Sequence, residues 1–119
     1  MYGHVRDGFP YLTVVLPGLN GVLHVECLLD TGFDGELVLP FDIIRQLDCT
    51  YAGEREITLA DRTLREVDTY DVRISWLGEE RLVEAILLDG RPLVGGKLLE
   101  DTLIQIEMRD GGEVSVEPL

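Results

Sequence analysis

Short runs of apolar and β-branched residues follow one another along this chain and are separated by turn residues. Within several runs apolar and polar residues alternate, which is typical of strands with one buried face. Helical spacing is rare: Phe41, Ile44 and Leu47 after Pro40 predict one short helix that ends near Asp48. Strands are predicted at 11–16, 22–29, 36–39, 56–60, 63–70, 71–76, 81–88, 103–108 and 113–116.

Turn signals join most of these strands to their neighbours in the sequence. Asn20-Gly21 is typical of a hairpin turn between strands 11–16 and 22–29. Further turns are predicted at 61–62, 77–80, 89–92 and 110–112. After the turn at 89–92 comes the apolar stretch 93–96, and a second small helix is predicted at 97–101. The pattern as a whole predicts a mostly β protein.

Length and composition fit one compact domain that covers residues 1–119. The chain has 45% hydrophobic residues, 13 glycines and 5 prolines, and a chain of this size buries roughly two thirds of its unfolded surface. Cys27 and Cys49 are its two cysteines, which indicates neither a disulfide framework nor a zinc site. Because Cys27 alternates with Val25 and Leu29, we expect it to be a small core residue.

Acidic residues dominate the charge. The formal net charge of −13 and the sequence pI of about 4.3 exclude nucleic acid and anionic membrane surfaces as favourable partners. No apolar run approaches the roughly 20 residues that span a bilayer, and residues 1–6 do not resemble a signal peptide. We therefore expect a cytoplasmic protein. Self-association would have to overcome charge repulsion, so low pH or added salt should favour it.

Asp30-Thr31-Gly32 is the most informative motif. An apolar strand leads into it, so a carboxylate enters a tight loop where water solvates the ionised form poorly. Asp and Gly are also common turn formers, so the tripeptide by itself is compatible with an ordinary turn.

Other chemical motifs are weak. A calcium loop that began at Asp30 would have Gly32 and Phe41 where ligand oxygens are required. Neither a dinucleotide fingerprint nor a phosphate-binding loop occurs, and His4 and His24 are isolated. We therefore predict neither a metal nor a cofactor.

Four features that occur in order carry a family resemblance. They are the apolar strand that enters Asp30-Thr31-Gly32, its continuation over 33–40, a hairpin around 59–63, and Leu93-Val94-Gly95 before Leu98-Leu99. With them the chain resembles the single-domain aspartic proteases of the retropepsin type, most closely the small bacterial members of clan AA. The resemblance spans residues 11–108 and implies an all-β, retropepsin-like closed barrel-like fold with one or two short helices.

The resemblance also implies roles for individual residues. Asp30 would be the catalytic acid, with Thr31 bonding across a dimer axis and the Gly32 backbone orienting the carboxylate. Asp34 matches a position that helps to hold substrate backbone or the dimer. The tip of a flap over the substrate would consist of Ala60, Asp61, Arg62 and Thr63, and the residues packed beneath the active loop would be Leu93, Val94 and Gly95.

Two positions depart from the family pattern. Gly96 and Lys97 lie where relatives often carry a polar or charged pair that braces the dimer, which bears on dimer strength. Arg62 lies where flap turns usually have glycine, which bears on the mobility of the tip.

Peptide hydrolysis without a covalent intermediate needs two carboxylates that share one proton. The chain has one Asp-Thr-Gly motif and is too short for two such lobes, so the second carboxylate is expected from Asp30 of a second copy. The sequence thus predicts a homodimeric aspartic endopeptidase that cleaves extended peptides or proteins, with activity on the acidic side. Two alternatives stay open: a catalytically inactive retropepsin-like binding module, and a structural β domain that docks a partner at its strand edges.

Overall fold

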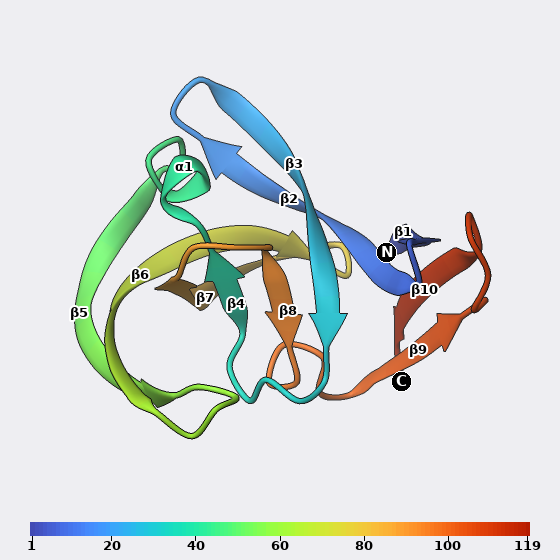
Figure 1. Cartoon of the computed structure of the whole chain (residues 1–119). Coiled ribbons are helices and arrows are strands. Elements are labelled where there is room, and N and C mark those ends of the chain that lie inside the picture. Colours follow the sequence, from blue (N-terminus) through green and yellow to red (C-terminus); the bar gives the residue numbers. More distant parts are fainter.

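The structure is a computed structural model that describes residues 1–119, and it contains ten strands and one short helix (Figure 1). The strands are β1 (Tyr2–Arg6), β2 (Phe9–Gly18), β3 (Gly21–Asp30), β4 (Leu37–Leu39), β5 (Cys49–Thr58), β6 (Leu64–Trp76), β7 (Glu79–Leu87), β8 (Leu93–Gly95), β9 (Thr102–Ile106) and β10 (Glu113–Pro118). The helix is α1 (Phe41–Ile44). The chain is therefore all-β, as its sequence pattern predicts.

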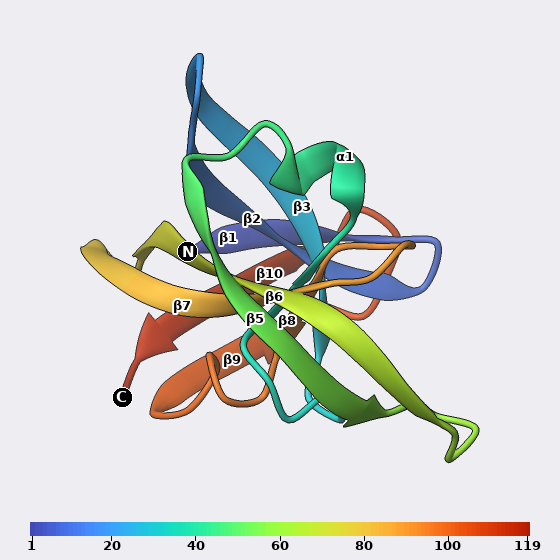
Figure 2. The same cartoon turned by 90° about the vertical axis from the view of Figure 1, so that its left-hand side faces the viewer.

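Six of the strands close into a barrel in the order β6, β7, β4, β8, β3 and β2. The ring closes where β2 pairs with β6 at Val15 and Ser75. Three further strands extend the sheet from β2 in the order β1, β10 and β9, and β5 extends it from β6. In Figure 1 the long β5–β6 hairpin curves around one side of the barrel, and β9 and β10 lie on the opposite side. Figure 2 shows the tip of this hairpin projecting from the body of the molecule.

Parallel pairing brings two strand ends together. β8 lies parallel to β3, with Leu28 beside Leu93 and Asp30 beside Gly95. β4 lies between β8, to which it is antiparallel, and β7, to which it is parallel. Because β3 and β8 point the same way, Asp30 and Gly95 lie at the same edge of the barrel.

The barrel interior is filled by alternating apolar side chains. On β2 the inward positions are Leu12, Val14 and Leu16, all fully buried, which is the period-2 pattern of a strand with one face on the core. The largest cluster also contains residues of the barrel strands, of α1, and of the turns after α1 and after β8: Val25, Cys27, Leu37, Leu39, Ile44, Leu47, Val72, Ile74, Trp76, Val83, Ala85, Val94, Leu98 and Leu99, with Val116 of β10. Burial of these side chains supplies most of the stabilisation of the fold.

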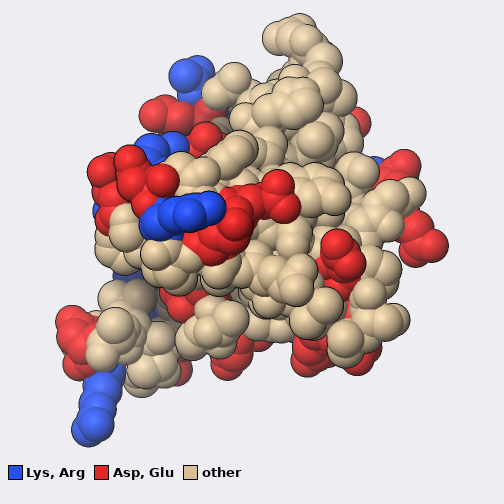
Figure 3. Space-filling model, turned by 90° about the vertical axis from the view of Figure 1, so that its right-hand side faces the viewer, with Lys and Arg blue, Asp and Glu red and all other residues tan.

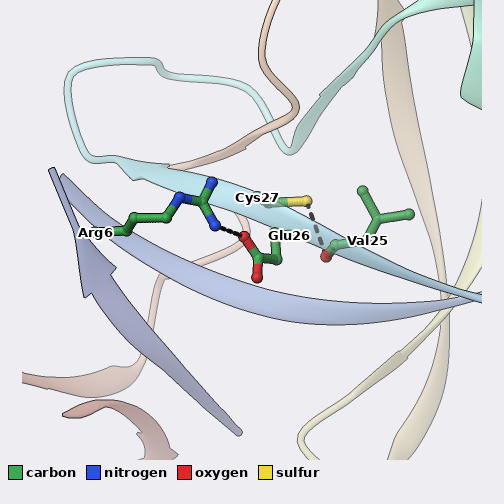
Figure 4. Close-up of polar contacts among 4 residues, drawn as sticks. All are labelled: Arg6, Val25, Glu26 and Cys27. Carbon is green, nitrogen blue, oxygen red and sulfur yellow. Dashed lines mark hydrogen bonds and ion pairs between the residues drawn. The ribbon is translucent and has the colours of Figure 1, made fainter. Parts of the chain in front are cut away.

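Neighbouring residues of β3 point to opposite sides of the sheet (Figure 4). Glu26 is exposed and forms an ion pair with Arg6 of β1, whose guanidinium lies 4.3 Å from the centre of the Tyr11 ring. Cys27 points inward, with its Sγ 3.8 Å from the carbonyl oxygen of Val25. Burial raises the pKa of the Cys27 thiol to about 12. The expectation that Cys27 is a core residue is confirmed.

The predicted break between residues 70 and 71 is wrong, because β6 is one continuous strand from Leu64 to Trp76. The buried positions of this strand change parity along its length. Val67 and Thr69 are buried in its first half, whereas Val72, Ile74 and Trp76 are buried in its second half. β6 is bent and passes from one apolar cluster to the other, so its buried face changes. In the sequence, this change looks like the boundary between two strands.

One helix prediction is too long and the other is wrong. α1 ends at Ile44 rather than near Asp48, and residues 97–101 form turns instead of a helix. The carbonyl oxygen of Gly95 accepts hydrogen bonds from the amides of both Leu98 and Leu99, at 3.2 Å each. Asp101 then adopts a φ of 59°, which ends any helical continuation.

Strand β1 has no counterpart among the predicted strands. One of its inward positions is Gly3, which has no side chain to show the alternation. Glycine is required there, because a Cβ would overlap the backbone carbonyl of Tyr11.

No helix in the structure has the length and apolar character needed to cross a membrane.

Candidate active site

Asp30 is the last residue of β3 and is half-buried. The backbone amide of Gly32 donates a hydrogen bond of 3.0 Å to Oδ1 of Asp30, and the amide of Phe33 donates one of 3.2 Å to its carbonyl oxygen. The chain thus turns immediately after the strand, and the turn orients the carboxylate. Thr31 is exposed in this turn and is not among the residues that line the cleft beside it.

The loop after Asp30 is held by the segment that follows β8. The amide of Gly96 donates to the carbonyl oxygen of Phe33 at 2.7 Å, and the amide of Gly95 donates to that of Glu36 at 2.9 Å. Gly95 is buried directly beneath the loop, and a Cβ at this position would overlap the carbonyl of Gly35 and the ring of Phe33. The site therefore depends on a glycine at position 95.

A cleft of about 1060 Å³ opens beside this loop, between the barrel edge and the inner side of the β5–β6 hairpin. Of the residues predicted for the site, five line the cleft: Asp30, Gly32, Asp34, Ala60 and Leu93. The apolar part of its lining consists of Phe33, Val38, Ile57, Leu59, Leu88, Ala60 and Leu93. A cleft of this size and mixed lining is large enough for several side chains of an extended peptide.

The remaining predicted residues lie outside the cleft. Asp61, Arg62 and Thr63 are exposed at the hairpin tip, and Val94 and Gly95 are buried beneath the loop. The structure thus brings the Asp30 loop, Ala60 and Leu93 together around one space, and separates them from the outermost residues of the tip.

The tip is a tight turn with its own hydrogen bonds. The amide of Arg62 donates to the carbonyl oxygen of Leu59 at 2.9 Å, and the amide of Leu59 donates to that of Thr63 at 2.9 Å. Arg62 has a φ of 67°, in the left-handed region that favours glycine. Oδ1 of Asp61 accepts hydrogen bonds from the hydroxyl and the amide of Thr63, and these lower the pKa of the Asp61 carboxyl.

A group of four charged residues that contact one another in or beside the cleft had not been singled out from the sequence. Arg55 of β5 forms an ion pair of 2.8 Å with Glu84 of β7, and so connects the hairpin to the barrel wall across β6. Oε1 of Glu36 accepts a hydrogen bond of 3.1 Å from the Glu84 amide, and Oε2 lies 3.6 Å from Arg81. The Glu36 side chain is only 10% exposed, so these partners compensate a largely buried charge.

One of these residues had a usable signal. Arg55 is followed at every second position by an apolar residue, first Ile57 and then Leu59 just beyond β5. The three side chains are therefore expected on the same face of the strand. Glu36 had none, because an acid at the start of the predicted strand 36–39 has no recognisable partner in the sequence until β4 and β7 are known to pair.

Comparison with known proteins gives no family assignment: no family model matches the chain, and no curated protein matches it.

Proposed function

We propose that this chain is a retropepsin-like aspartic endopeptidase that is active as a homodimer. One observation carries the proposal: Asp30, oriented by the Gly32 amide at the end of an apolar strand, lines a large cleft beneath a long β-hairpin. The order of the motifs along the sequence and the all-β barrel support the same assignment. No metal or cofactor enters the proposed reaction.

In the proposed dimer, Asp30 of each protomer contributes one carboxyl group to a dyad that holds one proton. The ionised carboxylate takes a proton from water while the oxygen of that water attacks the peptide carbonyl carbon. The protonated carboxyl group gives its proton to the carbonyl oxygen. The tetrahedral intermediate then collapses, the C–N bond breaks, and the amine leaves with a proton returned through the dyad.

An extended peptide fits the cleft better than a compact ligand. Its backbone would follow the hairpin and the loop at Asp30, and alternate side chains would contact apolar residues such as Ile57, Leu88 and Leu93. The Arg55–Glu84 ion pair would fix the hairpin at a set height above the catalytic carboxylate. We also propose a cytoplasmic location, which is compatible with two free thiols at Cys27 and Cys49.

The test is cleavage of a peptide library from about pH 4 to 7, which brackets the range of a shared-proton dyad. We expect wild-type protein to cleave and Asp30→Asn to lose at least about a thousandfold in kcat/KM, since the substitution removes the carboxyl groups of both protomers from the dyad. Asp89→Asn is the matched control, because Asp89 also follows an apolar strand and precedes a glycine but lies outside the cleft.

Retained cleavage by Asp30→Asn would refute the proposed mechanism. Peptide binding by the wild type with no products at any pH would instead favour the inactive binding module.

A further inference from the structure

Lys97 is the single lysine of the chain, and it lines the cleft that contains Asp30. All other basic residues are arginines, and of these only Arg55 also lines the cleft. Arg55 already has a partner, since its guanidinium lies 2.8 Å from the carboxylate of Glu84. Lys97 takes part in none of the ion pairs of the structure. It is therefore the one basic group of the cleft that no carboxylate neutralises.

The backbone holds Lys97 at a fixed place relative to the candidate catalytic acid. Gly95, two residues earlier in the chain, is paired with Asp30 in the parallel register of β8 and β3. The amide of Lys97 itself donates a hydrogen bond of 3.2 Å to the carbonyl oxygen of Gly35. Figure 1 shows the turn that follows β8 beside the loop that follows β3. The Lys97 side chain therefore starts from the edge of the cleft, next to the proposed catalytic loop.

The side chain of Lys97 is free to meet a ligand, although its backbone is fixed. Leu98 and Leu99, the next two residues, are buried in the core and anchor the turn, whereas Lys97 is exposed. A lysine carries its ammonium group on a flexible four-carbon stem and offers three hydrogen-bond donors. A carboxylate that enters the cleft is the partner that such a group binds best.

The electrostatic surroundings make this one cation decisive. The chain has a formal net charge of −13. Acidic side chains are spread over the face shown in Figure 3, and the basic ones there lie mostly beside them. The acidic residues of the cleft lining also outnumber the basic ones; they are Asp30, Asp34, Glu36, Glu56 and Glu84. Such a lining repels acidic side chains of a peptide, except at the place where a free cation meets them.

We propose that Lys97 determines specificity, because its ammonium group binds the carboxylate of a glutamate or aspartate side chain at one position of the substrate peptide. This inference rests on the proposed function and names its substrate class: peptides with one acidic residue near the cleaved bond, set in an otherwise uncharged or basic stretch. Successive side chains of an extended peptide point to opposite sides. Moving the acidic residue by one position therefore takes its carboxylate away from Lys97.

Peptide binding to the Asp30→Asn variant tests the proposal without turnover. The probes are labelled peptides of uncharged residues in which one glutamate is moved through every position, each with a matched peptide that has glutamine instead. Fluorescence anisotropy at about pH 6, where a glutamate side chain is ionised, measures their affinities. We expect one position at which glutamate binds about tenfold more tightly than glutamine, the value of a partly exposed charged hydrogen bond. Equal affinities of the matched peptides at every position would overturn the proposal.

Substitutions of Lys97 in the same background show whether its charge causes the preference. Lys97→Gln should abolish the preference for glutamate, Lys97→Arg should keep it, and Lys97→Glu should transfer it to lysine at the same peptide position. Arg73→Gln is the matched control, because it removes the same charge from an exposed site outside the cleft and should keep the preference. A residue that only braced the turn would change the affinities of both matched peptides alike. An unchanged ratio in Lys97→Gln would therefore refute the proposal.

This inference and the proposed function fail separately. Position-specific binding of glutamate by a chain whose wild type cleaves nothing supports the role of Lys97 and refutes the endopeptidase. Cleavage of peptides by the wild type, with no position at which glutamate is preferred to glutamine, refutes the role of Lys97 alone.

Discussion

Gly95 of β8 lies so close to the carbonyl of Gly35 that a single methyl group on its Cα would overlap that carbonyl. The contact brings the end of β8 directly beneath the loop that follows Asp30. β8 pairs in parallel with β3, the strand that ends at Asp30. The geometry of the proposed catalytic loop is therefore set by backbone packed against backbone, and the ring of Phe33 packs against the same two glycines.

Gly95→Ala should lower the free energy of unfolding by about 1–3 kcal/mol, because the backbone carbonyl of Gly35 cannot move aside without displacing the loop. Urea denaturation followed by the fluorescence of Trp76 measures the change. Gly96→Ala is the matched control: a Cβ there would meet the carbonyl oxygens of Phe33 and Thr31 at 3.4 Å, which is close to ordinary contact. Equal losses in the two variants would show that the overlap at Gly95 is relieved by relaxation.

Arg62→Gly should stabilise the hairpin tip by about 0.5–1 kcal/mol, because glycine adopts the left-handed φ of 67° without steric cost. The gain is local, so the measurement is hydrogen exchange at the amides of Leu59 and of the substituted position, which close the turn. Arg62→Ala keeps the strain and should change neither rate. If alanine slowed exchange as much as glycine, loss of the arginine side chain rather than relief of strain would be the cause.

The carboxyl of Asp61 should titrate below its ordinary pKa, because the hydroxyl and the amide of Thr63 donate hydrogen bonds to its charged form. A lowered pKa in the folded state means that these bonds stabilise the tip above the ordinary pKa of 3.8 and are lost as the pH falls through the folded value. NMR titration of the side chain measures this. Thr63→Val removes one donor and should raise the pKa of Asp61, and an unchanged pKa would contradict the hydrogen bond.

The two thiols should differ in reactivity. Burial raises the pKa of Cys27 to about 12, whereas Cys49 is half-exposed and its pKa is raised by partial burial and by Asp48. At pH 8 a thiol reagent should modify Cys49 first and Cys27 only as the protein unfolds. Cys49→Ser should abolish the fast phase of modification, and a fast phase that persists in that variant would show that Cys27 is accessible in the folded protein.

Cys27 also predicts a loss of stability in alkali. The unfolded thiol ionises near pH 9.0 while the buried thiol stays neutral up to about pH 12. The unfolded state therefore releases a proton that the folded state keeps, and stability falls as the pH rises between these values. Cys27→Ala should flatten this fall when the free energy of unfolding is measured by urea titration at several pH values. A slope equal to that of the wild type would assign the loss to other groups.

Strand content was readable from the sequence because most strands bury one face, as β2 does with Leu12, Val14 and Leu16. The prediction of strands failed at Gly3, where a buried position has no side chain, and in β6, where the buried face changes between Thr69 and Val72. In both places the contacts with a neighbouring strand, and not the local alternation of side chains, decide the structure.

The candidate site divides in the same way. Asp30 and Gly32 are recognisable because a tight turn after an apolar strand is a local pattern. The packing of Gly95 beneath the loop was predicted from the resemblance of Leu93-Val94-Gly95 to a family motif. The charges of Arg55, Glu84 and Glu36 come together only through the order of strands β5, β6, β7 and β4. No local pattern in the sequence encodes that order.

Strand β6 runs without interruption from the hairpin tip at Leu64 to the barrel seam at Ser75, where it meets Val15. One strand of the hairpin above the cleft thus continues without a break into the wall of the barrel. Lifting of the tip would therefore bend β6 itself. If the hairpin closed over a bound peptide, the strain would be transmitted along β6 to its pairing with β2 at Val15 and Ser75. Binding in the cleft and the stability of the barrel would then be mechanically coupled.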